Sequence, residues 1–301
     1  MLRLIAARGA AVGAVLALAL ALAPAAASAA TPHYYLALGD SLSQGMQPNV
    51  RGQTVNTNEG YPDQLLALEG SHVPNLTLVK LGCGGDTTGS MLTGHGNAAA
   101  AKFLHCDRTG GSQLKAAELF LRAHHGAGEV PLVTVDIGAN DVDGCASVPT
   151  SQIGSCVSSG EASIKHDLPL ILKGLHQAAP KGTTFAGMTL YDPVLSEYFS
   201  ASSTARALGT ASVALVQQIN AVLTASDKAA GFRTADVAGA FGTYDSTDMV
   251  PFDGGSIPVN VARLCSWTWA CTTPPSGPNI HANRNGYAVI AGAFAKVVGR
   301  L

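Results

Sequence analysis

The chain has 301 residues, of which 47% are hydrophobic and 13% are charged, and its formal net charge is −2. No cluster of lysine and arginine is present, which argues against a nucleic-acid partner. The length allows one large α/β domain of about 270 residues behind an N-terminal targeting segment.

Residues 1–30 have the pattern of a secretory signal peptide. Two arginines lie near the start, an Ala/Leu/Val run covers residues 10–23, and Ala27-Ser28-Ala29 is a small-residue cleavage pattern. We expect cleavage after Ala29 or Ala30 and secretion from the cell. The alternative is an N-terminal membrane anchor, but the apolar run is short for a helix that spans a bilayer.

Residues 31–301 are expected to be a single soluble domain. They contain no other uninterrupted apolar run of spanning length, and their 16 basic and 20 acidic side chains give a net charge of −4. We expect a monomer that does not insert stably into membranes.

Five apolar runs predict strands that are buried on both faces. They are rich in Val, Thr and Leu and alternate little, which is typical of a parallel sheet. The predicted strands are Tyr34–Leu38, Leu76–Leu81, Val130–Ile137, Thr183–Leu190 and Phe232–Val237.

Helical patterns alternate with these runs. The predicted helices are Tyr61–Glu69, Ser112–His125, Glu161–Ala179, Ala205–Ala230 and Asn283–Val298. Pro169 is expected to bend or divide the third helix. Such alternation indicates a three-layer α/β/α sandwich around a central, mostly parallel five-stranded sheet. Met46–Gly60 and Phe241–Pro278 have no assignment, and unassigned segments of that length are usually functional.

All six cysteines follow the signal peptide, and an even number in a secreted chain indicates disulfides. We expect neighbouring cysteines to pair, which closes short loops. The alternative is a zinc site, but no Cys-x-x-Cys pair and no Cys/His cluster has ligand spacing. The expected disulfides are Cys83–Cys106, Cys145–Cys156 and Cys265–Cys271.

The residues that follow the predicted strands form a recognisable chemical set. In open α/β sheets, sites lie beyond the carboxyl ends of the strands. Ser41 follows the first strand, a glycine turn containing Gly85 follows the second, and Asn140 follows the third. His281 lies near the C-terminus. A nucleophile, a main-chain donor, a side-chain donor and a base are the groups that acyl transfer requires.

Four short motifs carry a resemblance to a known family. They are "GDSLS" at Gly39–Ser43, "GCGGDTT" at Gly82–Thr88, "GAND" at Gly138–Asp141 and "NIHANRNGY" at Asn279–Tyr287. In this order, spread over almost all of the predicted domain, they resemble the blocks of the SGNH hydrolases, also called GDSL lipases and esterases.

The resemblance implies a flavodoxin-like SGNH fold and a role for each block. Ser41 would attack the ester carbonyl, and His281 would take its proton and return it to the leaving alcohol. The main-chain N–H groups of Ser41 and Gly85 and the side-chain amide of Asn140 would form the oxyanion hole. No metal and no cofactor is implied.

Each of these residues also has an ordinary structural interpretation. Ser41 and Asn140 are common turn residues. Gly85 has an equally flexible neighbour in Gly84, and His281 could cap a helix or lie on the surface. Asp40 and Asp141 are expected to stabilise turns by accepting main-chain N–H groups rather than to react.

The sequence departs from the family at one position. The family usually has an aspartate three residues before the histidine, where this chain has Pro278. The Pro278 carbonyl is the first candidate to orient His281, and the Asn279 side-chain oxygen is the second. Asp248 or Asp253 is the third. We therefore predict a Ser41–His281 dyad held by a neutral acceptor.

The predicted function is that of a secreted serine esterase or lipase that hydrolyses carboxylic (acyl) esters of small molecules or lipids. The alternatives are a carbohydrate acetylesterase of the same family and a catalytically dead secreted binding module. Within the long 241–278 segment, Phe252, Trp267 and Trp269 either line an acyl groove or belong to a structural loop held by a disulfide.

Overall fold

A five-stranded parallel sheet forms the centre of the molecule in a computed structural model that describes residues 32–95, 106 and 109–301. The predicted signal peptide lies outside these residues. The strand order is β4-β1-β5-β6-β7. The strands are β1 (His33–Gly39), β4 (Leu76–Lys80), β5 (Leu132–Asp136), β6 (Thr184–Met188) and β7 (Arg233–Ala235).

The order of the strands determines where a site can form. β1 pairs with β4 on one side and with β5 on the other, so the chain crosses from β1 to β4 in one direction and then from β4 past β1 to β5 in the other. The carboxyl ends of β1 and β5 then flank the topological switch point, where open α/β sheets bind ligands. Ser41 follows β1 and Asn140 follows β5. All five predicted strands are confirmed, with ends within a few residues of those expected.

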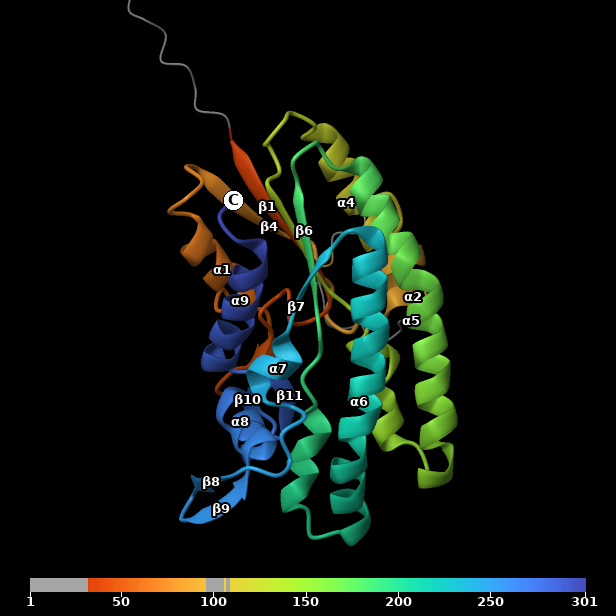
Figure 1. The fold of residues 1–301 in the computed structure, drawn as a ribbon, viewed down its shortest axis with the longest axis vertical. Helices are drawn as coiled ribbons and strands as arrows, with labels where there is room; N and C mark the ends of the chain where they lie inside the picture. Colours follow the sequence, from red (N-terminus) through yellow and green to blue (C-terminus); the bar gives the residue numbers. More distant parts are fainter. Residues whose placement is uncertain (1–31, 96–105, 107–108) are drawn as a thin grey trace, which may run out of the picture. The chain divides into compact units, whose positions relative to one another are not determined.

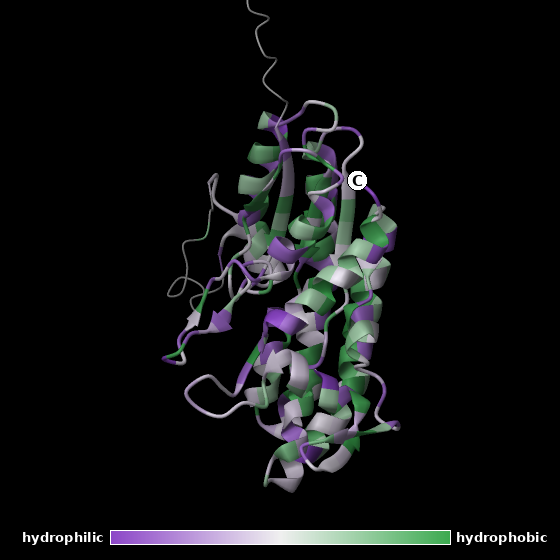
Figure 2. Cartoon of the chain, turned by 90° about the vertical axis from the view of Figure 1, so that its left-hand side faces the viewer, coloured by the Kyte–Doolittle hydropathy of each residue, from purple (hydrophilic) through white to green (hydrophobic). Residues whose placement is uncertain are grey.

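Helices cover both faces of the sheet, which confirms the three-layer architecture (Figure 1). One face carries α1 (Tyr61–Glu69) and α9 (Arg284–Val298), with α7 (Val237–Phe241) and α8 (Val259–Trp267) packed next to α9. The other carries α2 (Thr88–Thr93), α4 (Gln113–Ala123), α5 (Thr150–Ala178) and α6 (Ser203–Ala230). Figure 2 shows hydrophobic residues along the helices and many hydrophilic residues in the loops.

The predicted start of the third helix was wrong. α5 begins at Thr150, well before the predicted start at Glu161, and of the two effects expected from Pro169, division of the helix does not occur. Its first turns are rich in Ser and Gly, which have low helix propensity, so the local pattern did not predict them. Packing decides instead, because Val157 and Gly160 are buried against neighbouring elements.

α6 is the one helix in the described part of the chain that is long and apolar enough to cross a membrane by length and composition. It packs against α5, β6 and β7. Its residues Ile219, Val222 and Leu223 are buried in the core of the domain.

The two unassigned segments contain small elements that join the sheet to the site. Met46–Gly60 includes a two-stranded hairpin of β2 (Gln47–Pro48) and β3 (Thr54–Val55). The 241–278 segment holds α8 and further short strands, one of which pairs with the strand that carries His281. These strands are β8 (Met249–Phe252), β9 (Gly255–Pro258), β10 (Thr268–Trp269) and β11 (Asn279–Ala282). Short 3₁₀ helices complete the fold: η1 (Ala139–Asp141), η2 (Asp143–Ser147) and η3 (Pro193–Phe199).

The three predicted disulfides are present. They join Cys83 to Cys106, Cys145 to Cys156, and Cys265 to Cys271. The second fastens η2 to the first turns of α5, and the third fastens the end of α8 to the segment before β11. Each closes a loop next to an element of the candidate site.

Candidate active site

Ser41 lies in a tight turn directly after β1. Gly39 has φ +131°, and a Cβ there would lie 1.9 Å from the carbonyl oxygen of Asp136, so glycine is required for the close approach of β1 and β5. The N–H of Asp40 donates to that same oxygen at 2.9 Å. The Leu42 N–H donates to the Asp40 carboxyl at 3.0 Å, the turn-stabilising role predicted for this aspartate. The turn therefore holds Ser41 at a defined position at the carboxyl end of β1.

A pair of buried carboxyls supports this turn. Asp136, the last residue of β5, accepts the Ser43 N–H at 3.1 Å and the Tyr61 hydroxyl at 2.8 Å. Burial raises the pKa of Asp40 to about 6, and burial together with the Asp40 charge raises the pKa of Asp136. Each carboxyl makes ionisation of the other less favourable, because neighbouring acids without a basic partner do not both ionise readily. Asp136 was not predicted as a site residue, although its place at the end of an apolar strand is a signal for such a role.

Two main-chain donors near Ser41 are free to bind a ligand. Among the described residues, the N–H groups of Ser41 and Gly85 have no hydrogen-bond partner. Gly85 has φ +77°, a conformation that favours glycine, which distinguishes it from Gly84 in the same turn. Main-chain N–H groups without a partner in the protein can donate to a negative oxygen of a ligand.

Asn140 lies in η1 and connects the turns after three strands. Its amide nitrogen donates to the carbonyl oxygen of Asp86 at 3.0 Å and lies 3.3 Å from the Asp40 carboxyl. Asp141 next to it accepts both the N–H and the hydroxyl of Thr88, at 2.9 and 2.7 Å, as expected for a residue that fixes turns. These contacts hold the Asn140 amide beside the turns that carry Ser41 and Gly85.

His281 lies on β11, and the Asn279 side chain holds its ring. The Asn279 Oδ1 atom lies 2.7 Å from His281 Nδ1 and also accepts the His281 main-chain N–H at 3.1 Å. Burial lowers the pKa of His281 to about 4. The imidazole is therefore neutral at pH 7, which a general base requires.

The Pro278 carbonyl was the first candidate to orient His281, but in the structure the second candidate, the Asn279 side-chain oxygen, contacts the imidazole. Among the described residues, neither Pro278 nor Asp248 nor Asp253 has a hydrogen bond or ion pair with the imidazole. The physical reason is local. Asn279 is two residues before His281, a spacing at which an asparagine side chain folds back onto the main-chain N–H, and the same oxygen then reaches Nδ1.

Ser41, Asn140 and His281 line one cavity of about 100 Å³. Gly85 does not border it. No hydrogen bond joins Ser41 Oγ to the imidazole in the described part of the chain. The cavity wall is mostly apolar and comes largely from residues after β5 and β6 and from α5 and α6: Val142, Cys145, Ile153, Val157, Leu190, Val194, Leu208, Leu215 and Ile219.

Two further carboxyls line this cavity. Burial, with the charges of neighbouring acids, raises the pKa of Asp143 to about 7. Burial raises the pKa of Asp192 to about 6, although its carboxyl accepts the Ser212 hydroxyl at 2.7 Å. The wall therefore gains negative charge as the pH rises through about 6 and 7.

The aromatic residues of the 241–278 segment do not form this wall. Phe252, Trp267 and Trp269 are all absent from the cavity lining. Trp267 packs edge-on against Phe241, which stacks on Tyr191. The segment is thus the disulfide-held structural element of the two alternatives. Among the described residues, no group of three or more His, Cys, Asp or Glu side chains is arranged to hold a metal ion.

The GDSL-like lipase/acylhydrolase family model matches residues 37–289, a range that includes all four motifs. The chain belongs to this family. This GDSL hydrolase therefore acts on carboxylic esters, the reaction class for which the family is named. No curated protein matches its sequence.

Solved structures are similar to this GDSL hydrolase at low sequence identity, and the first of the three named here shares its fold. An extracellular lipase from Streptomyces rimosus is 18% identical, with 88% of this chain and 99% of that chain covered and a TM-score of 0.53. The acetylxylan esterase Axe2 from Geobacillus stearothermophilus is also 18% identical, with 89% and 94% covered and a TM-score of 0.48. A phospholipase A1 from Streptomyces albidoflavus is 17% identical, with 77% and 94% covered and a TM-score of 0.44.

Proposed function

We propose that this protein is a secreted serine esterase whose catalytic groups are a Ser41–His281 dyad. The observation that carries the proposal is a single cavity lined by Ser41, Asn140 and a neutral His281 whose Nδ1 is bound to an acceptor. With Nδ1 protonated, the Nε2 lone pair is available to accept the proton of the Ser41 hydroxyl.

The reaction then follows from the donors around Ser41. Oγ attacks the carbonyl carbon of the ester, and the proton of Oγ passes to His281 Nε2. The negative oxygen that forms accepts hydrogen bonds from the free N–H groups of Ser41 and Gly85 and from the Asn140 amide. Loss of one such donor typically lowers kcat by ~10²–10³. His281 returns the proton to the leaving alcohol, and water hydrolyses the acyl-enzyme by the same steps.

The mostly apolar cavity wall supports an acyl group as its occupant. Three disulfides support an oxidising location, and residues 1–30 have the signal-peptide pattern, so the proposed location is extracellular, with cleavage near Ala29 or Ala30. The mature enzyme would be residues 31–301.

The test measures kcat/KM on p-nitrophenyl esters from acetyl to palmitoyl, with the Ser41→Ala variant as control. We expect activity that is lost in the variant. An optimum at long chains identifies a lipase, and activity on acetyl alone identifies a carbohydrate-type acetylesterase. A folded, oxidised wild-type protein without Ser41-dependent activity on any ester would contradict the proposal and favour the binding module.

A further inference from the structure

An asparagine that holds the catalytic histidine must keep one orientation. If its oxygen faces Nδ1, the histidine is protonated there and Nε2 is a base. If its NH₂ group faces Nδ1, the proton moves to Nε2 and the base is lost. In serine proteases, replacement of the aspartate by asparagine costs ~10⁴ in kcat through this wrong tautomer. The orientation of the Asn279 amide is therefore decisive in this protein.

Two contacts define that orientation. The His281 main-chain N–H, which can only donate, lies 3.1 Å from the Asn279 atom assigned as Oδ1, so this atom is the oxygen. At the other end of the amide, Nδ2 donates to Thr54 Oγ1 at 2.9 Å. The first contact selects which atom faces the histidine. The second holds the plane of the amide so that one oxygen can serve both the main-chain N–H and Nδ1.

Thr54 lies on β3, and its hairpin is anchored to the domain on two sides. On one side, Trp269 Nε1 donates to Gln47 Oε1 at 3.3 Å, and the Tyr287 hydroxyl donates to the Met46 carbonyl at 2.8 Å.

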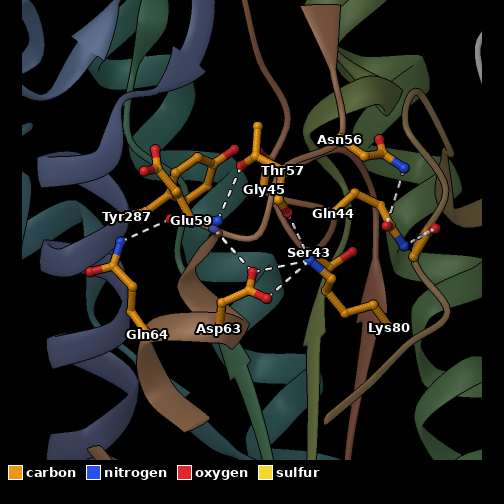
Figure 3. A network of polar contacts seen from close by, with 12 residues as sticks. Ser43, Gln44, Gly45, Asn56, Thr57, Glu59, Asp63, Gln64, Lys80 and Tyr287 are labelled. Carbon is orange, nitrogen blue, oxygen red and sulfur yellow. Dashed lines mark hydrogen bonds and ion pairs between the residues drawn. The ribbon is translucent and has the colours of Figure 1, made fainter. Parts of the chain in front are cut away.

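On the other side, a polar network fixes the end of the same segment (Figure 3). Lys80 Nζ donates to the Thr57 carbonyl at 2.9 Å and pairs with the Asp63 carboxylate at 3.0 Å. The Thr57 hydroxyl donates to the Gly45 carbonyl at 2.6 Å. The hairpin is thus fixed against the same residues that follow Ser41, and Thr54 meets Asn279 at a defined place.

We propose that Thr54 is a positioning residue that keeps the Asn279 amide oriented toward His281. The β2–β3 hairpin thereby supports the histidine in a chain that lacks the usual acid at position 278. This inference rests on the proposed dyad. Thr54 acts through Asn279 and does not touch the reacting atoms.

The test is a double-mutant cycle with Thr54→Val, Thr54→Ser and Asn279→Asp. Valine has the shape of threonine without the acceptor, so T54V should lower kcat about three- to tenfold with little change in KM, the effect of one hydrogen bond of ~0.5–1.5 kcal/mol. T54S keeps the acceptor and should restore kcat to within about twofold. In the N279D background both side-chain oxygens are equivalent, so T54V should change kcat by less than about twofold.

A spectroscopic measurement separates orientation from general damage. In ¹⁵N-histidine-labelled protein, the wild type should show the His281 proton on Nδ1, and T54V should show a population with the proton on Nε2. Gln53→Ala is the matched control, because it removes an exposed hairpin contact to Asn49 at 3.1 Å and leaves Thr54 and Asn279 in place. We expect Q53A to leave both kcat and the tautomer unchanged.

Three results would overturn the proposal: equal loss of kcat on T54V in both backgrounds, no loss in either, or an unchanged tautomer in T54V. Failure of the proposed function is distinguishable, because it would appear as wild-type activity that survives S41A, or as no activity at all. The tautomer measurement tests the Thr54 contact in either case.

Discussion

The pH dependence of kcat/KM tests the neutral acceptor directly. In the proposed dyad His281 must be neutral to act as a base, and burial lowers its pKa from 6.5 to about 4. A lowered histidine pKa means that the base becomes protonated, and activity is lost, as the pH falls through about 4. We therefore expect the acid limb of the wild-type profile well below 6.5. Asn279→Asp places a carboxylate where a neutral oxygen now lies 2.7 Å from Nδ1.

The size of the change follows from Coulomb's law. A unit negative charge about 4 Å from the centre of the imidazolium stabilises it by about 4 kcal/mol at an effective dielectric constant near 20. That corresponds to about three pKa units, and the desolvation of the new carboxylate offsets part of it. We expect the acid limb of N279D to move upward by about one to three units.

The assay is kcat/KM on one soluble p-nitrophenyl ester between pH 3.5 and 8 at constant ionic strength. Asn283→Asp is the matched control. It adds the same charge two residues from His281, but its side chain caps α9 through the N–H groups of Asn285 and Gly286. This variant should move the limb much less. A wild-type limb near 6.5 would refute the effect of burial, and an N279D profile identical to wild type would refute the Asn279 contact.

Three further predictions concern the elements around the site. In α5, Gly160→Ala would place a Cβ 2.3 Å from the Asp141 carbonyl oxygen, so we expect a lower Tm and a lower kcat because the turn of Asn140 is displaced. Gly154→Ala is the control, because a Cβ there meets open space, and it should stabilise the protein by up to about 1 kcal/mol in unfolding experiments. A stabilised, fully active G160A variant would contradict this packing. Burial raises the pKa of Asp227 to about 7. The folded state therefore keeps a proton that the unfolded state loses above about pH 4, and the free energy of unfolding falls as the pH rises from about 4 to 7. Asp227→Asn should therefore raise Tm more at pH 8 than at pH 5 in calorimetry, and an equal change at both pH values would argue against the shift. Leu215→Phe, in the cavity wall, should lower kcat/KM for long acyl esters while the acetyl ester keeps its rate; a uniform loss across chain lengths would exclude the wall as the acyl site.

The sequence by itself determined the layers of the fold and the groups at the edge of the sheet. Strands buried on both faces show as continuous apolar runs, and parallel strands place their carboxyl ends together, so the residues after each run could be expected to meet. Ser41 and Asn140 follow from this rule, whereas His281 follows from the resemblance of its motif, and all three residues line one cavity. The disulfide pairings followed from short spacings along the chain.

Only the tertiary structure decided how the histidine is held and what surrounds it. The contact of Asn279 with Thr54 joins residues 225 positions apart, and although Asn279 was the second candidate to hold His281, no local pattern marks Thr54. The early start of α5 was also not predictable from local patterns, because it depends on packing rather than on helix propensity. Nor was the cavity wall, to which α5 and α6 contribute and the aromatic residues of the 241–278 segment do not. Local patterns report the neighbours that a residue has along the chain. Which side chains approach across the fold depends on the packing of whole elements, and that information is distributed over the entire sequence.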